Sequence, residues 1–194
     1  MSKRIKIIFR PHPELEGKHA LLSPSKYHWV KDDKEKYLQR INNEFAKQRG
    51  NELHELAKTL IKLRIKIKED KTTFGMYVND AIDFRMLPEI PVKYSNYCFG
   101  TVDAVCYNER KSLLRIHDLK TGTSPVNVLQ LMLYAAIICL DNNVNPNDIS
   151  FELRIYQNND YKQWNPTGEE IGELMSNIIE KNEWTEDIFI REEW

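Results

Sequence analysis

The fold is decided by three segments: FGTVDAV (residues 99–105), LLRIHDLKTGTSPV (113–126) and LQLMLYAAIICL (129–140). The first segment alternates with β-branched and aromatic side chains, as a strand does, and a polar break of hairpin length follows it at residues 108–111. The second segment begins as the returning strand. The third is an apolar run that is typical of a helix packed on a sheet. A β-hairpin followed by a helix is therefore expected.

The hairpin carries two carboxylates and a lysine near one end. Asp118 and Lys120 are two residues apart in the second strand, so their side chains share a face, and Asp103 lies in the partner strand. Carboxylates from neighbouring strands suit Mg²⁺, which takes one or two protein carboxylates together with waters and phosphate oxygens. A lysine beside such an ion can stabilise charge on a scissile phosphate. The pattern indicates phosphodiester hydrolysis.

Two further polar residues lie on the helix after the hairpin. Gln130 and Tyr134 are four residues apart and therefore share a face, which we expect to point toward the strand ends. Between the strand and this helix, Gly122 and Pro125 provide a turn. This turn lies beside Lys120 and is predicted to contact a DNA backbone, either through the hydroxyl of Thr121 or Thr123 or through amides at the start of the helix.

Upstream, an amphipathic helix is predicted over residues 51–68, with His54 in its first turn beside the apolar stripe. A histidine in such a position is more often a packed core or capping residue than a metal ligand. Gly50 is expected to interrupt the helical sequence that precedes it. Helical sequence is also predicted from Ser23-Pro24 to residue 48, with a break near residues 32–33.

These motifs together resemble the PD-(D/E)XK nuclease superfamily, most closely its RecB-like and Cas4-like exonuclease branch. The resemblance covers roughly residues 20–156 and is carried by the following matches: Leu22-Ser-Pro-Ser25, Gly50-Asn-Glu-Leu-His54, Gly100-Thr-Val-Asp103, Asp118-Leu-Lys120 and Gln130-Leu-Met-Leu-Tyr134. Asp at position 118 replaces the Glu of many relatives and is an accepted variant. Each motif is weak alone, but their order and spacing make the combination fairly specific.

The resemblance implies a site and a reaction. The implied ligands of one or two Mg²⁺ or Mn²⁺ ions are His54, Asp103, Asp118, the main-chain carbonyl of Leu119 and, at the start of the preceding strand, Glu89. The implied catalytic set is Asp103, Asp118, Lys120, Gln130 and Tyr134. Further DNA contacts are expected at Ser25 and Lys26. The ions would activate water for in-line attack and stabilise the leaving oxygen.

The implied biology is DNA end processing in recombination or repair, as in small phage and mobile-element exonucleases. The partners would be single- or double-stranded DNA ends and a single-strand annealing protein. No Walker A sequence is present, so the chain is not expected to unwind DNA by itself. Many relatives carry an iron–sulfur cluster on one early and three late cysteines. Here the cysteines are Cys98, Cys106 and Cys139, so no cluster is expected.

Composition fits this interpretation. A chain of 194 residues with 41% hydrophobic and 29% charged residues is expected to form one soluble domain. No apolar run is long enough to cross a bilayer and no signal peptide is recognisable, so a cytoplasmic location in a bacterium or phage-infected cell is expected, without membrane binding. Free thiols are expected for the three cysteines.

Charge is unevenly distributed. Residues 26–71 hold 13 Lys and Arg against 8 Asp and Glu, whereas residues 141–194 hold 4 against 13. A polyanion would bind the first block rather than the second. On charge alone, both blocks can equally be solvated helix faces.

The remaining elements complete the predicted α/β fold, a central mixed sheet of about four or five strands flanked by helices. Strands are expected at residues 3–10, 89–94 and 149–156, and a helix at residues 72–86, capped by Thr72 or Thr73. A second helix should open at the capping box Thr167-Gly-Glu-Glu and reach about Lys181. A tail from Trp184 is expected to pack on the core through Trp184, Ile188 and Phe189.

One domain is predicted over residues 1–194: a helical part at about 20–86, a catalytic core at about 87–156, and a C-terminal helix and tail at 157–194. Arg154 and Tyr156 share a strand face, where they either reach substrate or pack across strands. Three other functions stay open. They are a structure-specific or nicking endonuclease, a DNA-binding or assembly module with a vestigial site, and a metal or small-molecule binder that is not a nuclease.

Overall fold

The computed structural model describes residues 11–18, 20–68 and 71–191, so the strand predicted at residues 3–10 lies outside it. The chain divides into two compact units, Met1–Lys47 and Gln48–Trp194. The first unit contains the short 3₁₀ helices η1 (Pro13–Leu15) and η2 (Pro24–Lys31) and the first half of α1 (Lys34–Leu63). Between η2 and α1, Asp32 accepts hydrogen bonds from Arg40 and pairs with Lys36 at 3.1 Å. The predicted break at residues 32–33 is confirmed.

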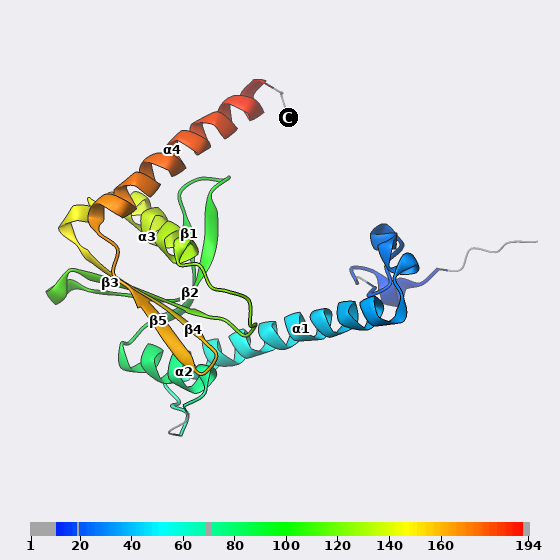
Figure 1. The fold of residues 1–194 in the computed structure, drawn as a ribbon. Coiled ribbons are helices and arrows are strands. Elements are labelled where there is room, and N and C mark those ends of the chain that lie inside the picture. The colour runs from blue at the N-terminus through cyan, green and yellow to red at the C-terminus, as the bar shows by residue number, and fades with distance from the viewer. Residues whose placement is uncertain (1–10, 19, 69–70, 192–194) are drawn as a thin grey trace, which may run out of the picture. The chain divides into compact units, whose positions relative to one another are not determined.

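The second unit is built on a five-stranded mixed sheet (Figure 1). Its strands, in spatial as well as chain order, are β1 (Leu87–Lys93), β2 (Phe99–Asn108), β3 (Leu113–Leu119), β4 (Ser150–Gln157) and β5 (Asp160–Trp164). All neighbouring strands are antiparallel except β3 and β4, which are parallel and joined through the helix α3 (Leu129–Asp141). The predicted α/β class, with a mixed sheet flanked by helices, is confirmed.

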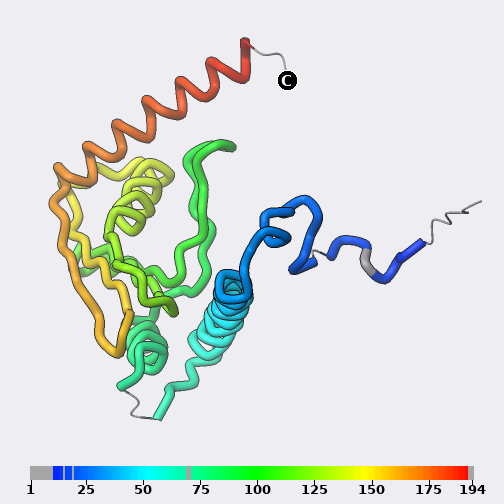
Figure 2. Tube along the Cα trace, turned by 45° about the vertical axis from the view of Figure 1, so that its right-hand side comes forward, coloured from blue at the N-terminus to red at the C-terminus, as the bar shows by residue number. Residues whose placement is uncertain are grey.

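Helices cover both faces of the sheet. The helices α3 and α4 (Gly168–Arg191) lie on one face, and α2 (Thr73–Asp83) lies on the other (Figures 1 and 2). The core under α3 contains Ile116, Leu131 and Leu153. The core under α2 is separate and also takes Ala57 and Ile61 from the end of α1. Phe151, Leu153 and Ile155 of β4 lie in the core under α3, whereas Tyr156 lies in the core under α2, as the alternation of strand side chains requires.

Several element boundaries follow from local chemistry. Thr72 Oγ1 accepts a hydrogen bond from the Gly75 amide (3.1 Å), so the predicted cap of α2 is confirmed. The capping box is confirmed as well, because Thr167 N donates to Glu170 Oε2 (2.8 Å) and Glu170 N donates to Thr167 Oγ1 (3.2 Å). The polar turn predicted between β2 and β3 is the short helix η3 (Glu109–Lys111), and a further 3₁₀ helix, η4 (Pro146–Asp148), precedes β4.

Three predictions about elements were wrong. Gly50 does not interrupt the helix, because α1 runs through it and ends at Leu63 rather than at residue 68. The expected C-terminal tail is helical, since α4 continues to Arg191. Trp184 and Ile188 on that helix are exposed rather than packed on the core, and Phe189 is stacked on Tyr97. The edge strand β5 was not predicted individually.

Candidate metal centre

The site lies where the regular pairing of β1 and β2 is interrupted. Pro88 pairs with Ala104 and Ile90 with Val102, but no pair joins Glu89 to Asp103 between them. Glu89 has a positive φ of 53°, a conformation that L-residues adopt rarely. Such breaks in a ladder re-aim side chains and are frequent beside functional sites. Here both residues at the break carry a carboxylate.

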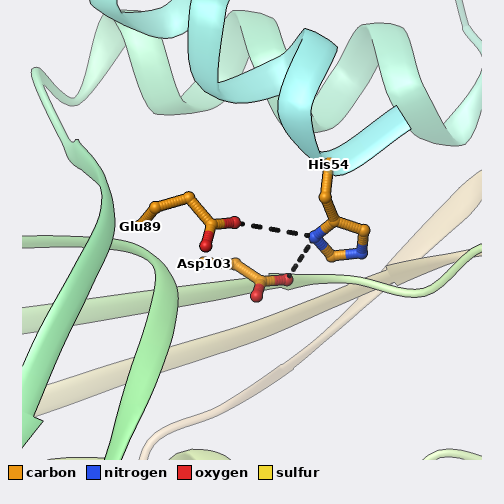
Figure 3. Close-up of side chains that lie close together, drawn as sticks. All are labelled: His54, Glu89 and Asp103. Carbon is orange, nitrogen blue, oxygen red and sulfur yellow. Dashed lines mark ion pairs between the residues drawn. The ribbon is translucent and has the colours of Figure 1, made fainter. Parts of the chain in front are cut away.

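The two carboxylates face a histidine from α1 (Figure 3). His54 Nδ1 lies 3.4 Å from Asp103 Oδ2 and 3.8 Å from Glu89 Oε1. One ligand atom from each of the three residues lies within 4.8 Å of the others, and all three side chains are half-buried. One imidazole and two carboxylates are a donor set that suits Mn²⁺ as well as Mg²⁺. These three residues are hereafter the His54–Glu89–Asp103 group.

A close helix contact positions His54. Gly50, one turn earlier on α1, is buried, and a Cβ atom there would lie 2.8 Å from Thr121 Oγ1. The absence of a side chain at Gly50 therefore lets α1 approach the turn after Lys120. Because Gly50 and His54 are four residues apart, they share a helix face, and this contact turns His54 toward the sheet.

Asp103 is held from the neighbouring strand as well. Its Oδ2 accepts a hydrogen bond from the Leu119 amide (2.9 Å). Burial, and next the negative charge of Asp118, raise the pKa of Asp103 to about 6, although His54 and the Leu119 hydrogen bond act in the opposite direction. Ionisation of Asp103 is unfavourable in the protein alone, and a bound cation would stabilise the ionised form.

Asp118 lies next to this group but is engaged differently. The β2–β3 register pairs Ala104 with His117, and Asp103 and Asp118 are the next residues along it. The Asp118 side chain is buried, and its Oδ1 accepts a hydrogen bond from Lys120 Nζ (3.1 Å). Its Oδ2 lies 3.0 Å from the same nitrogen but accepts no hydrogen bond from the described residues. Asp118 Oδ2 is therefore ion-paired with Lys120, and a metal ion bound there would share this oxygen with the lysine.

Lys120 is connected to α3 through two side chains. Its Nζ also donates to Gln130 Oε1 (3.3 Å), and Gln130 Nε2 donates to Tyr134 Oη (3.3 Å). Gly100 accommodates Tyr134, because a Cβ at Gly100 would lie 2.9 Å from the tyrosine ring. The structure thus joins the four predicted residues Asp118, Lys120, Gln130 and Tyr134 in one hydrogen-bonded chain.

The other predicted site residues are placed as follows. The Leu119 side chain is buried in the core under α2, and Thr121 contacts the α1 backbone at Gly50 as described above. Thr123 is exposed in the loop before α3. Ser25 and Lys26 are exposed in η2 of the first unit. The roles of these five residues, and of Asp118 as a metal ligand, stay predictions.

Arg154 and Tyr156 serve internal packing. Tyr156 Oη donates to Asp80 Oδ2 (2.6 Å), and Arg154 Nη1 donates to the same oxygen (3.1 Å). Tyr156 Oη also lies 3.3 Å from Nδ1 of the buried His117. The sequence left open whether this strand face reaches substrate or packs within the protein. The structure shows it packed within the protein.

Sequence reasoning missed Tyr77 on α2. Its side chain is almost fully buried, and its pKa is raised well above the ordinary value, by burial first and then by the charges of Asp103 and Glu89. Tyr77 therefore lies near the carboxylates of the site. No sequence pattern indicates this position, because Tyr77 fits the apolar face of an amphipathic helix.

The three cysteines, Cys98, Cys106 and Cys139, are free, and none belongs to the His54–Glu89–Asp103 group. None of the described helices combines the length and the hydropathy that a bilayer-spanning segment needs. The sheet, its flanking helices and the His54–Glu89–Asp103 group are compatible with a PD-(D/E)XK fold. Comparison with protein-family models, with curated proteins and with solved structures finds no match.

Proposed function

We propose that this chain is a metal-dependent deoxyribonuclease of the PD-(D/E)XK type that hydrolyses phosphodiester bonds, with exonuclease action favoured over endonuclease action. The observation that carries the proposal is the His54–Glu89–Asp103 group beside the Asp118–Lys120 pair. A cation site next to a lysine is an arrangement that can support phosphodiester hydrolysis, since both groups stabilise negative charge on the phosphate and on the leaving oxygen.

The residues present fit Mg²⁺ or Mn²⁺. Two carboxylates and one imidazole lie within 4.8 Å of one another, and the buried Asp118 has an oxygen that accepts no hydrogen bond from the described residues. The ligands would be His54, Glu89 and Asp103, with Asp118 beside them. A bound ion would supply activation of water and charge stabilisation at the phosphate.

The chain's own residues then have separate tasks. Within the described part of the chain, Lys120 Nζ donates hydrogen bonds to Asp118 and Gln130, so one of its three ammonium protons would be available for a phosphate oxygen. Gln130 and Tyr134 fix where that ammonium group lies. Thr121, adjacent to Lys120, and the exposed Thr123 would contact the DNA backbone, with Ser25 and Lys26 as further contacts.

The wider biology is part of the same proposal. Processing of DNA ends in recombination or repair, in the cytoplasm of a bacterium or a phage-infected cell, would suit a small nuclease without helicase motifs. A single-strand annealing protein is the expected partner. A structure-specific or nicking endonuclease would use the same residues and differs only in the substrate that it accepts.

The test compares end-labelled linear single- and double-stranded DNA with closed circular DNA, in Mg²⁺, in Mn²⁺ and in EDTA. Loss of the linear DNA alone, only with metal, supports an exonuclease. Cutting of closed circles supports an endonuclease. Lys120→Ala should abolish cleavage, whereas Lys111→Ala, in the turn at the other end of the β2–β3 hairpin, should not. Absence of cleavage in every metal, or equal activity of Lys120→Ala, contradicts the proposal.

A further inference from the structure

A preformed pocket adjoins Lys120 on the side of α3. It has a volume of about 510 Å³, within the usual range for small-molecule sites. It is bounded by the loop after β3, by the first turns of α3 and by the end of β4. Lys120 and Gln130, which belong to the proposed catalytic chain, form part of its wall. Any occupant would therefore touch the proposed site.

One side chain holds the loop that shapes this pocket. Gln157 Nε2 donates hydrogen bonds to the backbone carbonyls of Gly122 (2.6 Å) and Ser124 (2.9 Å). At the other side, Asn127 Oδ1 accepts a hydrogen bond from the Leu129 amide (2.8 Å) at the start of α3. Both ends of the loop are thus held by amide side chains, and these hydrogen bonds shape the pocket.

The pocket is lined by apolar side chains, amide side chains and a lysine. Pro125, Leu129 and Leu133 give it apolar surface, and Asn127, Gln130 and Gln157 give it amide groups that can both donate and accept hydrogen bonds. Among the described residues that line it, Lys120 alone is charged. A nucleobase has apolar faces and an edge of donors and acceptors, so it matches this lining. Gln157 Oε1 and Asn127 Nδ2 take no part in the hydrogen bonds of the described residues, so an acceptor and a donor are left for the edge of a base.

We infer that this pocket binds one unpaired nucleotide next to the scissile phosphate, so that the substrate is single-stranded DNA or a frayed or overhanging end. The inference rests on the proposed function and names the substrate of the same site. A base inside a duplex cannot enter, because its edge is occupied by its partner and its faces by its neighbours. The lysine at the pocket wall would receive the phosphate attached to the bound nucleotide.

The test measures binding in EDTA, so that it does not depend on metal or on cleavage. A fluorescent thymidine strand and an abasic strand of the same length are compared by anisotropy. The wild type should bind the thymidine strand about tenfold more tightly. Leu129→Glu should remove most of this ratio, and Pro125→Glu, in the loop, provides a second variant. Ile188→Glu on α4 adds the same charge at an exposed apolar residue outside the pocket and should keep the ratio.

Using the ratio of the two strands cancels the general effect of an added negative charge on DNA binding. Equal binding of the two strands by the wild type, or an unchanged ratio in both pocket variants with native circular dichroism, overturns the inference. The cleavage assay on intact strands separates the two proposals. Tighter binding of the thymidine strand without cleavage of intact DNA overturns the nuclease function alone. Cleavage of intact DNA together with equal binding of the thymidine and abasic strands overturns the pocket assignment alone.

Discussion

Asp103 is the residue whose ionisation depends most on what the site holds. Its pKa of about 6 lies above the ordinary value of 3.8, so the folded protein binds a proton there more tightly than the unfolded chain does. The stability of the metal-free protein therefore falls as the pH rises from about 3.8 to about 6 and stays reduced above that. The difference corresponds to at most about 3 kcal/mol.

Asp103→Asn should therefore raise the free energy of unfolding of the metal-free protein at pH 8, by about 1–3 kcal/mol. The amide removes the charge that burial and Asp118 disfavour. Urea denaturation in EDTA at pH 8 and at pH 4 measures the effect, which should shrink toward pH 4. If the variant is less stable than the wild type at pH 8, the ionised Asp103 side chain does not destabilise the metal-free protein.

Gln130 tests whether the position of Lys120 matters for catalysis. Gln130→Ala removes the hydrogen bond from Lys120 Nζ to Gln130 Oε1 and leaves the Asp118–Lys120 pair in place. We expect kcat to fall about tenfold, which corresponds to the roughly 1.5 kcal/mol that a hydrogen bond to a charged group contributes. The free energy of unfolding should change little, because Gln130 is exposed.

Tyr134→Phe is the matched control for Gln130→Ala. It removes only the hydrogen bond between Gln130 and the phenol, and it keeps the ring that packs over Gly100. Its effect on kcat should be smaller than that of Gln130→Ala. If Gln130→Ala leaves kcat unchanged on every substrate that the wild type cleaves, Gln130 has no part in positioning the lysine.

At the scale of elements, the central feature is the contact between α1 and the turn after β3. Gly50→Ala should gain up to about 1 kcal/mol from helix propensity but must displace Thr121 Oγ1, which would lie 2.8 Å from the new Cβ. In a Thr121→Ala background that oxygen is absent, and the Thr121 Cβ lies at an ordinary 4.0 Å from the new atom.

A double-mutant cycle by thermal unfolding checks this contact. Gly50→Ala should be neutral or destabilising alone and stabilising by about 1 kcal/mol when Thr121 is alanine. The single variant should also cleave DNA more slowly, because Thr121 follows Lys120. Equal effects of Gly50→Ala in both backgrounds would mean that helix and turn are not in contact.

The same contact explains why the helix boundary was predicted wrongly. A mid-helix glycine costs about 1 kcal/mol relative to alanine, which argues for a break if the segment is considered alone. Glycine is favoured here because Thr121, 71 positions later in the chain, approaches this turn of the helix closely. A sequence pattern within the helix contains no information about that contact. Strands β2, β3 and β4 were predicted because alternation is a local signal. β5 has mainly exposed side chains and lacks that signal.

At the scale of the whole molecule, the site depends on α1, β1 and β2, and the helix α2 separates α1 from the two strands in the chain. The sequence could nominate His54, Asp103, Asp118 and Lys120 through spacing and family resemblance. It could not establish that Glu89 turns toward His54, because the positive φ at Glu89 breaks the alternation from which strand faces are predicted. Nor could it show that Asp118 pairs with Lys120 rather than lying within the His54–Glu89–Asp103 group.

The distribution of core residues makes a prediction about the first unit. Among the described residues, every buried hydrophobic side chain belongs to Ala57 or a later residue. A chain of residues 48–194 should therefore fold and keep its metal binding, with a melting temperature within a few degrees of the full chain. Differential scanning calorimetry measures this. Failure of the shortened chain to unfold cooperatively would show that the first 47 residues contribute to the core.

The most direct test of the proposed metal centre is Mn²⁺ binding, measured by electron paramagnetic resonance on the wild type and on Glu89→Gln. The wild type should bind Mn²⁺, and the variant should bind it at least about tenfold more weakly, because it loses a charged ligand. Glu109→Gln, the same change in the exposed turn between β2 and β3, should bind like the wild type. If the wild type binds no Mn²⁺, or Glu89→Gln binds it equally well, the His54–Glu89–Asp103 group is not a metal centre.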